Sequence, residues 1–229
     1  MNWKHPVLAL TLLVGGITAR AQTPAAFDGV YTATKDDVHH TWILVDGYAS
    51  QTAYTDTAFL TTEGGPFMFT GDRMEVTVEF NSANADEVGQ RKSYHWQAGA
   101  DGSFTVDGIK WKRETRPQAL DGAWHITGRM KDGELHPIQH DGTRKTLKLL
   151  KDGWFQWFAI DPGKLAFLGT GGGHYTFQDG QYTEEVVFFS RDNSRVGAKL
   201  QFAGEMKDGA WHHSGKSSKG EPMYEVWGR

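Results

Sequence analysis

Two glutamates are the first candidates for acid–base chemistry in this sequence. Glu184 lies in a segment typical of a β-strand, and Glu225 lies in another close to the C-terminus. Side chains alternate between the two faces of a strand, so Glu225 shares its face with Trp227, which we expect in a core. Two buried carboxylates close together raise the pKa of one of them and leave a proton to transfer at neutral pH. We predict such a catalytic pair here; the alternative is that one or both are exposed on a strand or pair with Arg195 and Arg229.

His174 is the third candidate for catalysis. It follows the run Gly169-Thr-Gly-Gly-Gly173, and glycines let a backbone approach a ligand closely. The alternative is that these glycines bend a strand of a barrel. The pair His136 and His140 has a spacing that suits zinc only on a helix, and Pro137 places this segment in a loop. We therefore expect no metal site.

Aromatic residues complete the predicted ligand-binding site. Trp157 lies on a strand with three other aromatic residues, and the strands expected beside it carry further rings. Such rings line an apolar pocket or stack on the faces of sugars. The alternative is that they fill the cores of small barrels. The predicted ligand-binding residues are Trp157, His174, Tyr175, Tyr182 and Glu184.

Several kinds of chemistry are excluded by what the sequence lacks. It contains no cysteine, so it offers neither a thiol nucleophile nor a disulfide. It has no Gly-x-Ser-x-Gly motif, and the glycine-rich run before His174 lacks the lysine and the helix of a phosphate-binding loop. We therefore expect no cofactor. The formal net charge of −4 argues against nucleic acid as a partner.

The elements that must position these residues come in two related sets. The segment Phe27–Tyr31, with its Asp-Gly pair, returns as Leu120–Trp124, and a second Asp-Gly pair follows in both copies. Later in each copy Glu75 matches Glu184, and an acid kept in both is a candidate for an inward-facing role. Self-similarity over about a hundred residues indicates a duplicated domain, not a solenoid of short repeats.

Almost every recognisable element has the pattern of a β-strand. Ten Asp-Gly pairs separate short alternating or aromatic runs. Asp-Gly is a strong hairpin signature because type I′ turns need positive φ at both central positions. No segment has a convincing helical period. In the second half we predict the strands 123–130, 143–150, 154–160, 165–169, 174–178, 181–190, 199–207, 210–215 and 223–227.

Consecutive hairpins favour barrels, because closure removes the two exposed edges of a sheet. The predicted fold class is all-β, with two tandem antiparallel β-barrels; a sandwich and one large barrel built from both halves are the alternatives. The polar segment 113–119, which contains Pro117, is the predicted linker. The predicted domains are a signal peptide at 1–21, a first barrel at 22–116 and a second barrel at 117–229.

Five features of the second half resemble a known family. They are the start Leu120–Trp124, the aromatic segment Trp154–Trp157, the triple glycine with His174, the segment Tyr182–Glu185 and the closing segment Tyr224–Trp227. Together they resemble the lipocalin-like (calycin) barrels found among bacterial exported proteins of unknown function. The resemblance covers most of residues 120–229 and implies, for the tandem duplication, barrels with an internal cavity. The first half departs from it, with Gln51 where the second has Trp157, which implies that the two cavities differ.

The first 21 residues have the pattern of a signal peptide. A positively charged start containing Lys4 is followed by a short apolar stretch and the small residues around Ala19 and Ala21. The apolar stretch is too short to cross a bilayer, which requires about 20 residues. No later segment is apolar enough to span one. We expect an exported protein, periplasmic or secreted, without a membrane span.

Three functions are compatible with these features. The leading hypothesis is a protein that binds a small apolar or amphipathic ligand, lipid-like or carbohydrate, in its second barrel. The alternative is an isomerase, lyase or hydrolase in which Glu184, Glu225 and His174, with Tyr182, transfer protons on a carbohydrate or small metabolite. The third is an interaction module, which would carry exposed coplanar tryptophans. An open cavity with converging acids and histidine would favour catalysis, and an apolar cavity would favour carriage.

Overall fold

The computed structural model describes residues 27–99, 103–139, 142–216 and 220–229. Within these ranges the chain forms β-strands and short 3-10 helices but no α-helix. The 3-10 helices are η2 (Ala85–Glu87), η3 (Pro162–Lys164) and η4 (Asn193–Arg195). The predicted signal peptide lies outside the described residues. The predicted all-β fold class is confirmed.

The first barrel is a closed antiparallel sheet of eight strands. Each strand pairs with the next one along the chain, and β9 closes the sheet by pairing with β1. A short extra strand, β6 (Phe80–Asn81), pairs with β4. The barrel strands are β1 (Gly29–Lys35), β2 (Val38–Val45), β3 (Tyr48–Tyr54), β4 (Phe59–Thr70), β5 (Arg73–Thr77), β7 (Arg91–Ala98), β8 (Phe104–Val106) and β9 (Ile109–Glu114).

The second barrel repeats this arrangement with eight strands, and β18 closes it by pairing with β10. Its extra strand is β11 (Glu134–Pro137), which pairs with the end of β10. Two closed barrels in tandem fit a lipocalin-like fold. The barrel strands are β10 (Gly122–Lys131), β12 (Lys145–Lys151), β13 (Trp154–Asp161), β14 (Ala166–Gln178), β15 (Gln181–Phe189), β16 (Lys199–Lys207), β17 (Ala210–Lys216) and β18 (Pro222–Gly228).

The Asp-Gly pairs serve two different purposes. Most form two-residue hairpin turns with positive φ at both positions, as at Asp46 (φ 50°) and Gly47 (φ 77°). Asp28 and Asp121 instead precede the first strand of each barrel. Their carboxylates accept hydrogen bonds from the backbone N–H groups of Asp46 and Asp152, which are the turn residues of the neighbouring hairpins. The same device thus ties the start of each barrel to its first hairpin.

Two predicted details of the second barrel are wrong. The sequence pattern predicts separate strands at 165–169 and 174–178, but β14 runs through both. The glycines between them do not break the strand, because they lie where backbones approach closely: a Cβ on Gly173 would lie 2.0 Å from the carbonyl oxygen of Glu185 at a bulge. The second detail is β11, which the sequence pattern leaves as a loop.

The match of Glu75 with Glu184 is also wrong, by one residue. The turn before Glu75 is Gly71-Asp72, whereas the turn before Glu184 is Asp179-Gly180, and both contain two residues. Aligning the two glycines therefore shifts the register. Counted from the turn, the counterpart of Glu184 is the buried Val76.

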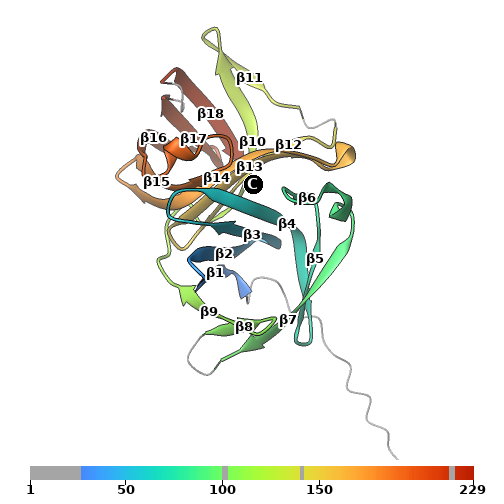
Figure 1. Cartoon of the computed structure of the whole chain (residues 1–229). Helices are drawn as coiled ribbons and strands as arrows, with labels where there is room; N and C mark the ends of the chain where they lie inside the picture. Colours follow the sequence, from blue (N-terminus) through green and yellow to red (C-terminus); the bar gives the residue numbers. More distant parts are fainter. Residues whose placement is uncertain (1–26, 100–102, 140–141, 217–219) are drawn as a thin grey trace, which may run out of the picture.

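The two barrels pack against each other through the outer faces of β1–β4 with β6 in the first and of β12–β15 in the second (Figure 1). One cluster of buried apolar residues joins them. The rings of Tyr48 and Phe158 stack with centroids 5.7 Å apart, and Phe80 lies 4.6 Å from Phe158. The first barrel contributes Val30, Ile43, Val45, Tyr48, Tyr54 and Phe80, and the second contributes Leu147, Leu149, Trp154, Phe158, Ile160 and Phe188.

A buried polar network lies within this apolar interface. Gln156 Oε1 accepts hydrogen bonds from the hydroxyls of Ser50 and Thr52 at 2.8 and 3.2 Å. Gln156 Nε2 donates to the hydroxyls of Thr62 and Thr170, each at 3.1 Å. One side-chain amide therefore bonds four hydroxyls drawn from both barrels. Because buried polar groups must be hydrogen-bonded, the network favours a single register of one barrel on the other.

We expect the substitution Gln156→Leu to lower the free energy of unfolding by about 2–4 kcal/mol, because it keeps the volume but leaves buried hydroxyls without their amide partner. Chemical denaturation measures this change. The matched control is Gln178→Leu at an exposed position of β14, where we expect a change within about 0.5 kcal/mol. Equal unfolding midpoints for the two variants would contradict a stabilising role for the network.

Candidate functional site

The second barrel encloses a cavity of about 890 Å³. This lies within the range of roughly 300–1,000 Å³ that is usual for small-molecule sites. It reaches solvent where the exposed residues Gln139, Arg144 and Arg191 line it, and we call this end the mouth. Its apolar walls are formed by Ile126, Ile138, Phe155, Trp157, Ala159, Val186, Phe189, Leu200, Phe202, Met223 and Trp227.

A buried ion pair lines this cavity. Lys148 on β12 and Glu184 on β15 are only 4% and 5% exposed, and Lys148 Nζ lies 3.1 Å from Glu184 Oε1. The hydroxyl of Tyr182 donates to the same oxygen at 2.9 Å. Burial and the neighbouring carboxylate raise the pKa of Tyr182 well above its usual value, so this hydroxyl stays protonated.

Aromatic rings surround the ammonium group of Lys148. It lies over the rings of Tyr182, Trp211 and Trp227, at 5.2, 5.3 and 5.1 Å from their centroids. Such cation–π contacts strengthen when water is excluded. The rings and Glu184 together replace the hydration that Lys148 loses on burial.

His213 on β17 lines the same cavity and is 2% exposed. Among the described residues neither of its ring nitrogens has a hydrogen-bond partner. The nearest carboxylate oxygen is Glu225 Oε2, 4.0 Å from Nδ1, which is too long for a hydrogen bond. Burial, and then the charge of Lys148, lower the pKa of His213 to about 2. The imidazole is therefore neutral at physiological pH, with one donor and one acceptor nitrogen.

Glu225 on β18 also lines the cavity, and its side chain is 13% exposed. Its Oε1 accepts a hydrogen bond from Arg129 at 2.8 Å. The structure thus brings Glu184 and Glu225 to one cavity. Each is held by a basic residue, so they do not form the directly coupled carboxylate pair that the sequence pattern suggests.

Gly171 leaves room for two aromatic rings of the cavity wall. Trp157 and Phe189 lie edge to face with centroids 5.7 Å apart. A Cβ on Gly171 would lie 2.8 Å from the indole nitrogen of Trp157 and 2.7 Å from the ring of Phe189. Glycine at this position therefore lets both rings line the wall.

Apolar residues stand in the first barrel at the positions of Lys148, Glu184 and His213. Counted from the equivalent hairpin turns and strand pairs, Lys148 corresponds to Trp42 and Glu184 to Val76. His213 corresponds to Val106, since each lies two residues after an aromatic residue paired with the closing tryptophan. All three first-barrel residues belong to one buried apolar cluster. The two barrels share a backbone plan, but at these three positions the first has apolar side chains where the second has titratable ones.

At the wall positions near the mouth it is the first barrel that has polar residues and the second that has apolar residues or glycine. The first-barrel counterparts of Gly171, Phe189, Leu200 and Phe202 are Glu63, Asn81, Lys92 and Tyr94.

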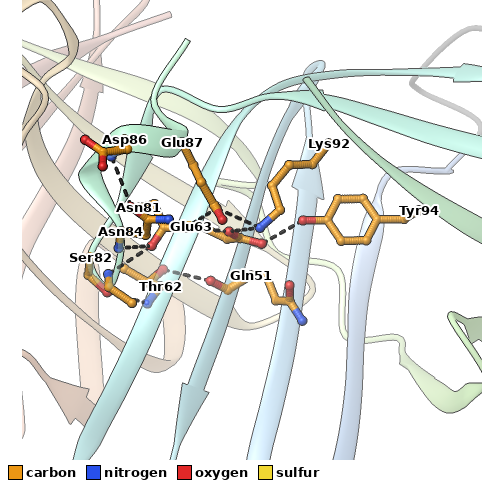
Figure 2. A network of polar contacts seen from close by, with 11 residues as sticks. Gln51, Thr62, Glu63, Asn81, Ser82, Asn84, Asp86, Glu87, Lys92 and Tyr94 are labelled. Carbon is orange, nitrogen blue, oxygen red and sulfur yellow. Dashed lines mark hydrogen bonds and ion pairs between the residues drawn. The ribbon is translucent and has the colours of Figure 1, made fainter. Parts of the chain in front are cut away.

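These polar residues bind one another (Figure 2). Lys92 Nζ lies 2.7 Å from Glu63 Oε2 and 2.9 Å from Glu87 Oε2. Tyr94 donates to Glu63 at 2.6 Å, and Asn81 donates to both glutamates. A hydrogen-bonded polar network therefore occupies the end of the first barrel that corresponds to the mouth of the second barrel.

The structure separates two of the predicted site residues from the cavity. The ring of His174 packs on Trp154, a residue of the interface between the barrels, with centroids 4.1 Å apart. Tyr175 is buried and donates from its hydroxyl to Asp121 at 2.6 Å, at the start of the second barrel. By contrast, Trp157 and Glu184 line the cavity, and Tyr182 contacts Glu184.

Sequence reasoning missed Lys148 and His213. Lys148 is visible in the sequence as the one charge within the run Leu147–Leu150, a pattern that points to a charge in a buried strand. The pair His212-His213 lies on a strand, so only one of its members can face the interior. Trp211 shares its face of the strand with His213, and this alternation is the signal that indicates which histidine faces the interior.

No model of a known protein family matches this chain, and no curated protein matches it. Across residues 27–99, 103–139, 142–216 and 220–229, no helix is long and apolar enough to cross a bilayer. In the same ranges no three His, Asp or Glu side chains gather in a way that could hold a metal ion. What the cavity can bind follows from its own lining.

The low pKa of His213 predicts a loss of stability in acid. The unfolded chain takes up a proton near pH 6.5, whereas the folded chain does so only near pH 2. The contribution of His213 to the free energy of unfolding is therefore full above pH 6.5. It falls by on the order of 1 kcal/mol per pH unit as the pH drops from there toward 2. The variant His213→Val, which carries the residue of the first barrel, lacks this dependence.

Urea denaturation of both proteins between about pH 5 and about pH 8 measures the difference. Other histidines with lowered pKa, such as His40 and His174, are common to both proteins and cancel. A wild-type-to-variant difference that does not change with pH would refute the assignment.

The ion pair of Lys148 and Glu184 predicts that the effects of substitutions on the free energy of unfolding are not additive. Lys148→Met leaves the Glu184 carboxylate buried and unpaired, and we expect it to lower the free energy of unfolding by about 3–5 kcal/mol. The triple variant Lys148→Met/Tyr182→Phe/Glu184→Leu removes both charges and the attached hydroxyl at similar volume. We expect it to be about as stable as the wild type, or more stable. Denaturation of the two variants measures this, and a triple variant less stable than the single one would contradict it.

Proposed function

We propose that the second barrel binds a small amphipathic molecule, with an apolar body against the aromatic walls and a polar group at the cluster of Lys148, Glu184 and His213. The cavity volume supports one ligand of this size. The first barrel is proposed to be a scaffold, because it is apolar at the positions of the cluster and a polar network occupies the end that corresponds to the mouth.

One observation carries this proposal. The second barrel has titratable side chains at three interior positions where the first barrel forms the same fold with apolar residues. Buried ion pairs contribute little to stability compared with apolar residues of similar size. The first barrel builds the same fold with Trp42, Val76 and Val106 at the three positions. The cluster in the second barrel is therefore not required by the fold, which is what a binding site predicts.

The enzyme hypothesis has a specific observation in its favour, because Glu184, Glu225 and His213 line one open cavity. The protonation states favour binding instead. His213 has a pKa of about 2, too low for an efficient general base near neutral pH. Both glutamates are engaged by basic residues. The interaction-module hypothesis predicts exposed tryptophans, and every described tryptophan is buried or half-buried.

We also propose that the protein is exported, on the sequence pattern of residues 1–21 alone. Exported proteins are often stabilised by disulfides, but this chain has no cysteine and must be stable without them. The large apolar interface between the barrels meets this need by burial.

Binding of the neutral fluorophore N-phenylnaphthylamine tests the proposal. We expect fluorescence to rise on binding to the wild type and the affinity to fall at least about tenfold in Leu200→Trp, because the larger ring fills the cavity beside the mouth. The matched control is Leu60→Trp on the exposed face of β4, where the side chain is 44% exposed. No binding to the wild type, or equal binding to Leu200→Trp, would refute the cavity as a ligand site.

A further inference from the structure

We infer that the ligand of the second barrel has two polar ends: an anionic group held at the mouth by Arg144 and Arg191, and an uncharged oxygen that hydrogen-bonds to His213 inside the barrel. This inference rests on the proposed function of the cavity and adds the chemical class of its ligand. The apolar body between the two ends would lie along the aromatic walls.

Two cations at the mouth lack a carboxylate partner in the part of the chain that the structure describes. Arg144 is exposed at the start of β12, and Arg191 follows β15. The guanidinium of Arg191 donates two hydrogen bonds to the carbonyl oxygen of Leu168 and lies 5.6 Å above the ring of Trp157. A neutral carbonyl does not cancel its charge. Guanidinium groups bind carboxylates and phosphates with paired hydrogen bonds, so an anionic group suits this position.

The other charged residues at the cavity rim do not cancel the positive charge of Arg144 and Arg191. Lys145 pairs with Glu79 at 2.6 Å, and Arg129 pairs with Glu225 at 2.8 Å. Glu221 is the one acid among the exposed charged residues of the lining that the structure describes. The two arginines therefore leave the mouth cationic, although the whole chain carries a net charge of −4. Such a local field attracts anions to the opening.

Gly169 of the second barrel leaves the space in which the guanidinium of Arg191 lies. Gly169 has a φ of 138°, and a Cβ there would lie 2.5 Å from Arg191 Nε. Only glycine leaves room for the guanidinium against the strand. The first-barrel counterparts of Arg191 and Arg144 are Ala83 and Val38, counted from the equivalent strand pairs. Both cations are thus specific to the barrel that has the open cavity.

The inner end of the ligand must match His213. This side chain is 2% exposed, and both ring nitrogens lack a partner among the described residues. An unpaired buried polar group costs about 1–3 kcal/mol, which a ligand hydrogen bond would recover. A hydroxyl or carbonyl oxygen fits, because the neutral imidazole offers one donor and one acceptor. A second anionic group would lie beside the carboxylates of Glu184 and Glu225, while the charge of Lys148 is already balanced.

Four probes with the same alkyl chain test the two ends separately: decanoate, ω-hydroxydecanoate, decanol and decanediol. Isothermal titration calorimetry measures the Kd of each. We expect the carboxylate and the inner hydroxyl each to tighten binding about tenfold. The double variant Arg144→Gln/Arg191→Gln should weaken the two acids about tenfold and leave the two alcohols unchanged. His213→Val should remove the gain from the inner hydroxyl alone, and Lys207→Gln, at an exposed position of β16, is the matched control.

The outcomes distinguish this inference from the proposed function. Acids and alcohols of equal affinity in the wild type would overturn the anionic end. Equal affinity of decanoate and ω-hydroxydecanoate, with no effect of His213→Val, would overturn the inner end. In both cases the cavity would still be a ligand site. If none of the four probes binds and N-phenylnaphthylamine does not bind either, the proposed function itself is refuted.

Discussion

Two strands of the second barrel, β12 and β13, are buried on both faces, and much of the structure follows from this constraint. One face of each strand lines the barrel and the other packs on the first barrel. A polar side chain on either face must find its partner inside the protein. Leu147 and Leu149 pack on the first barrel, so Lys148 between them points into the second, where Glu184 balances its charge. Gln156 faces the interface and there binds hydroxyls from both barrels.

The fold follows from local sequence to a large extent. The Asp-Gly turns and the alternating runs between them predict antiparallel hairpins, and closure into two barrels follows from the need to remove sheet edges. Two features resisted this reasoning. The glycines around Gly173 suggest a break, yet they serve close backbone approach within one long strand. The equivalent turns Gly71-Asp72 and Asp179-Gly180 have their two residues in opposite order. Matching their glycines shifts the alignment of the two copies by one residue, which local similarity cannot reveal.

The site is less predictable from the sequence than the fold, because β12 and β13 are buried on both faces. A strand buried on both faces shows no alternation, so Lys148 gives no sign of which way it points. Glu184 was found although its supposed counterpart, Glu75, was misaligned. His213 shares a face with Trp211 on one strand, but its place beside Glu184 depends on how distant strands pair to close the barrel. The charged interior is thus a product of how strands from distant parts of the chain pair, and not of any short motif.

Residues at equivalent positions of the two barrels touch one another across the interface. Ser50 and Gln156 lie equally far from their hairpin turns and are hydrogen-bonded, and the rings of Phe59 and Phe167 stack with centroids 6.4 Å apart. Contact between equivalent positions is the property of an isologous interface, as in a two-fold homodimer. The chain therefore has the architecture of a fused dimer. In a dimer of identical chains every substitution occurs twice, whereas in a fused one an interior can change in one half while the shared interface is kept. That freedom permits one barrel with a charged interior beside another that stays entirely apolar at the same positions.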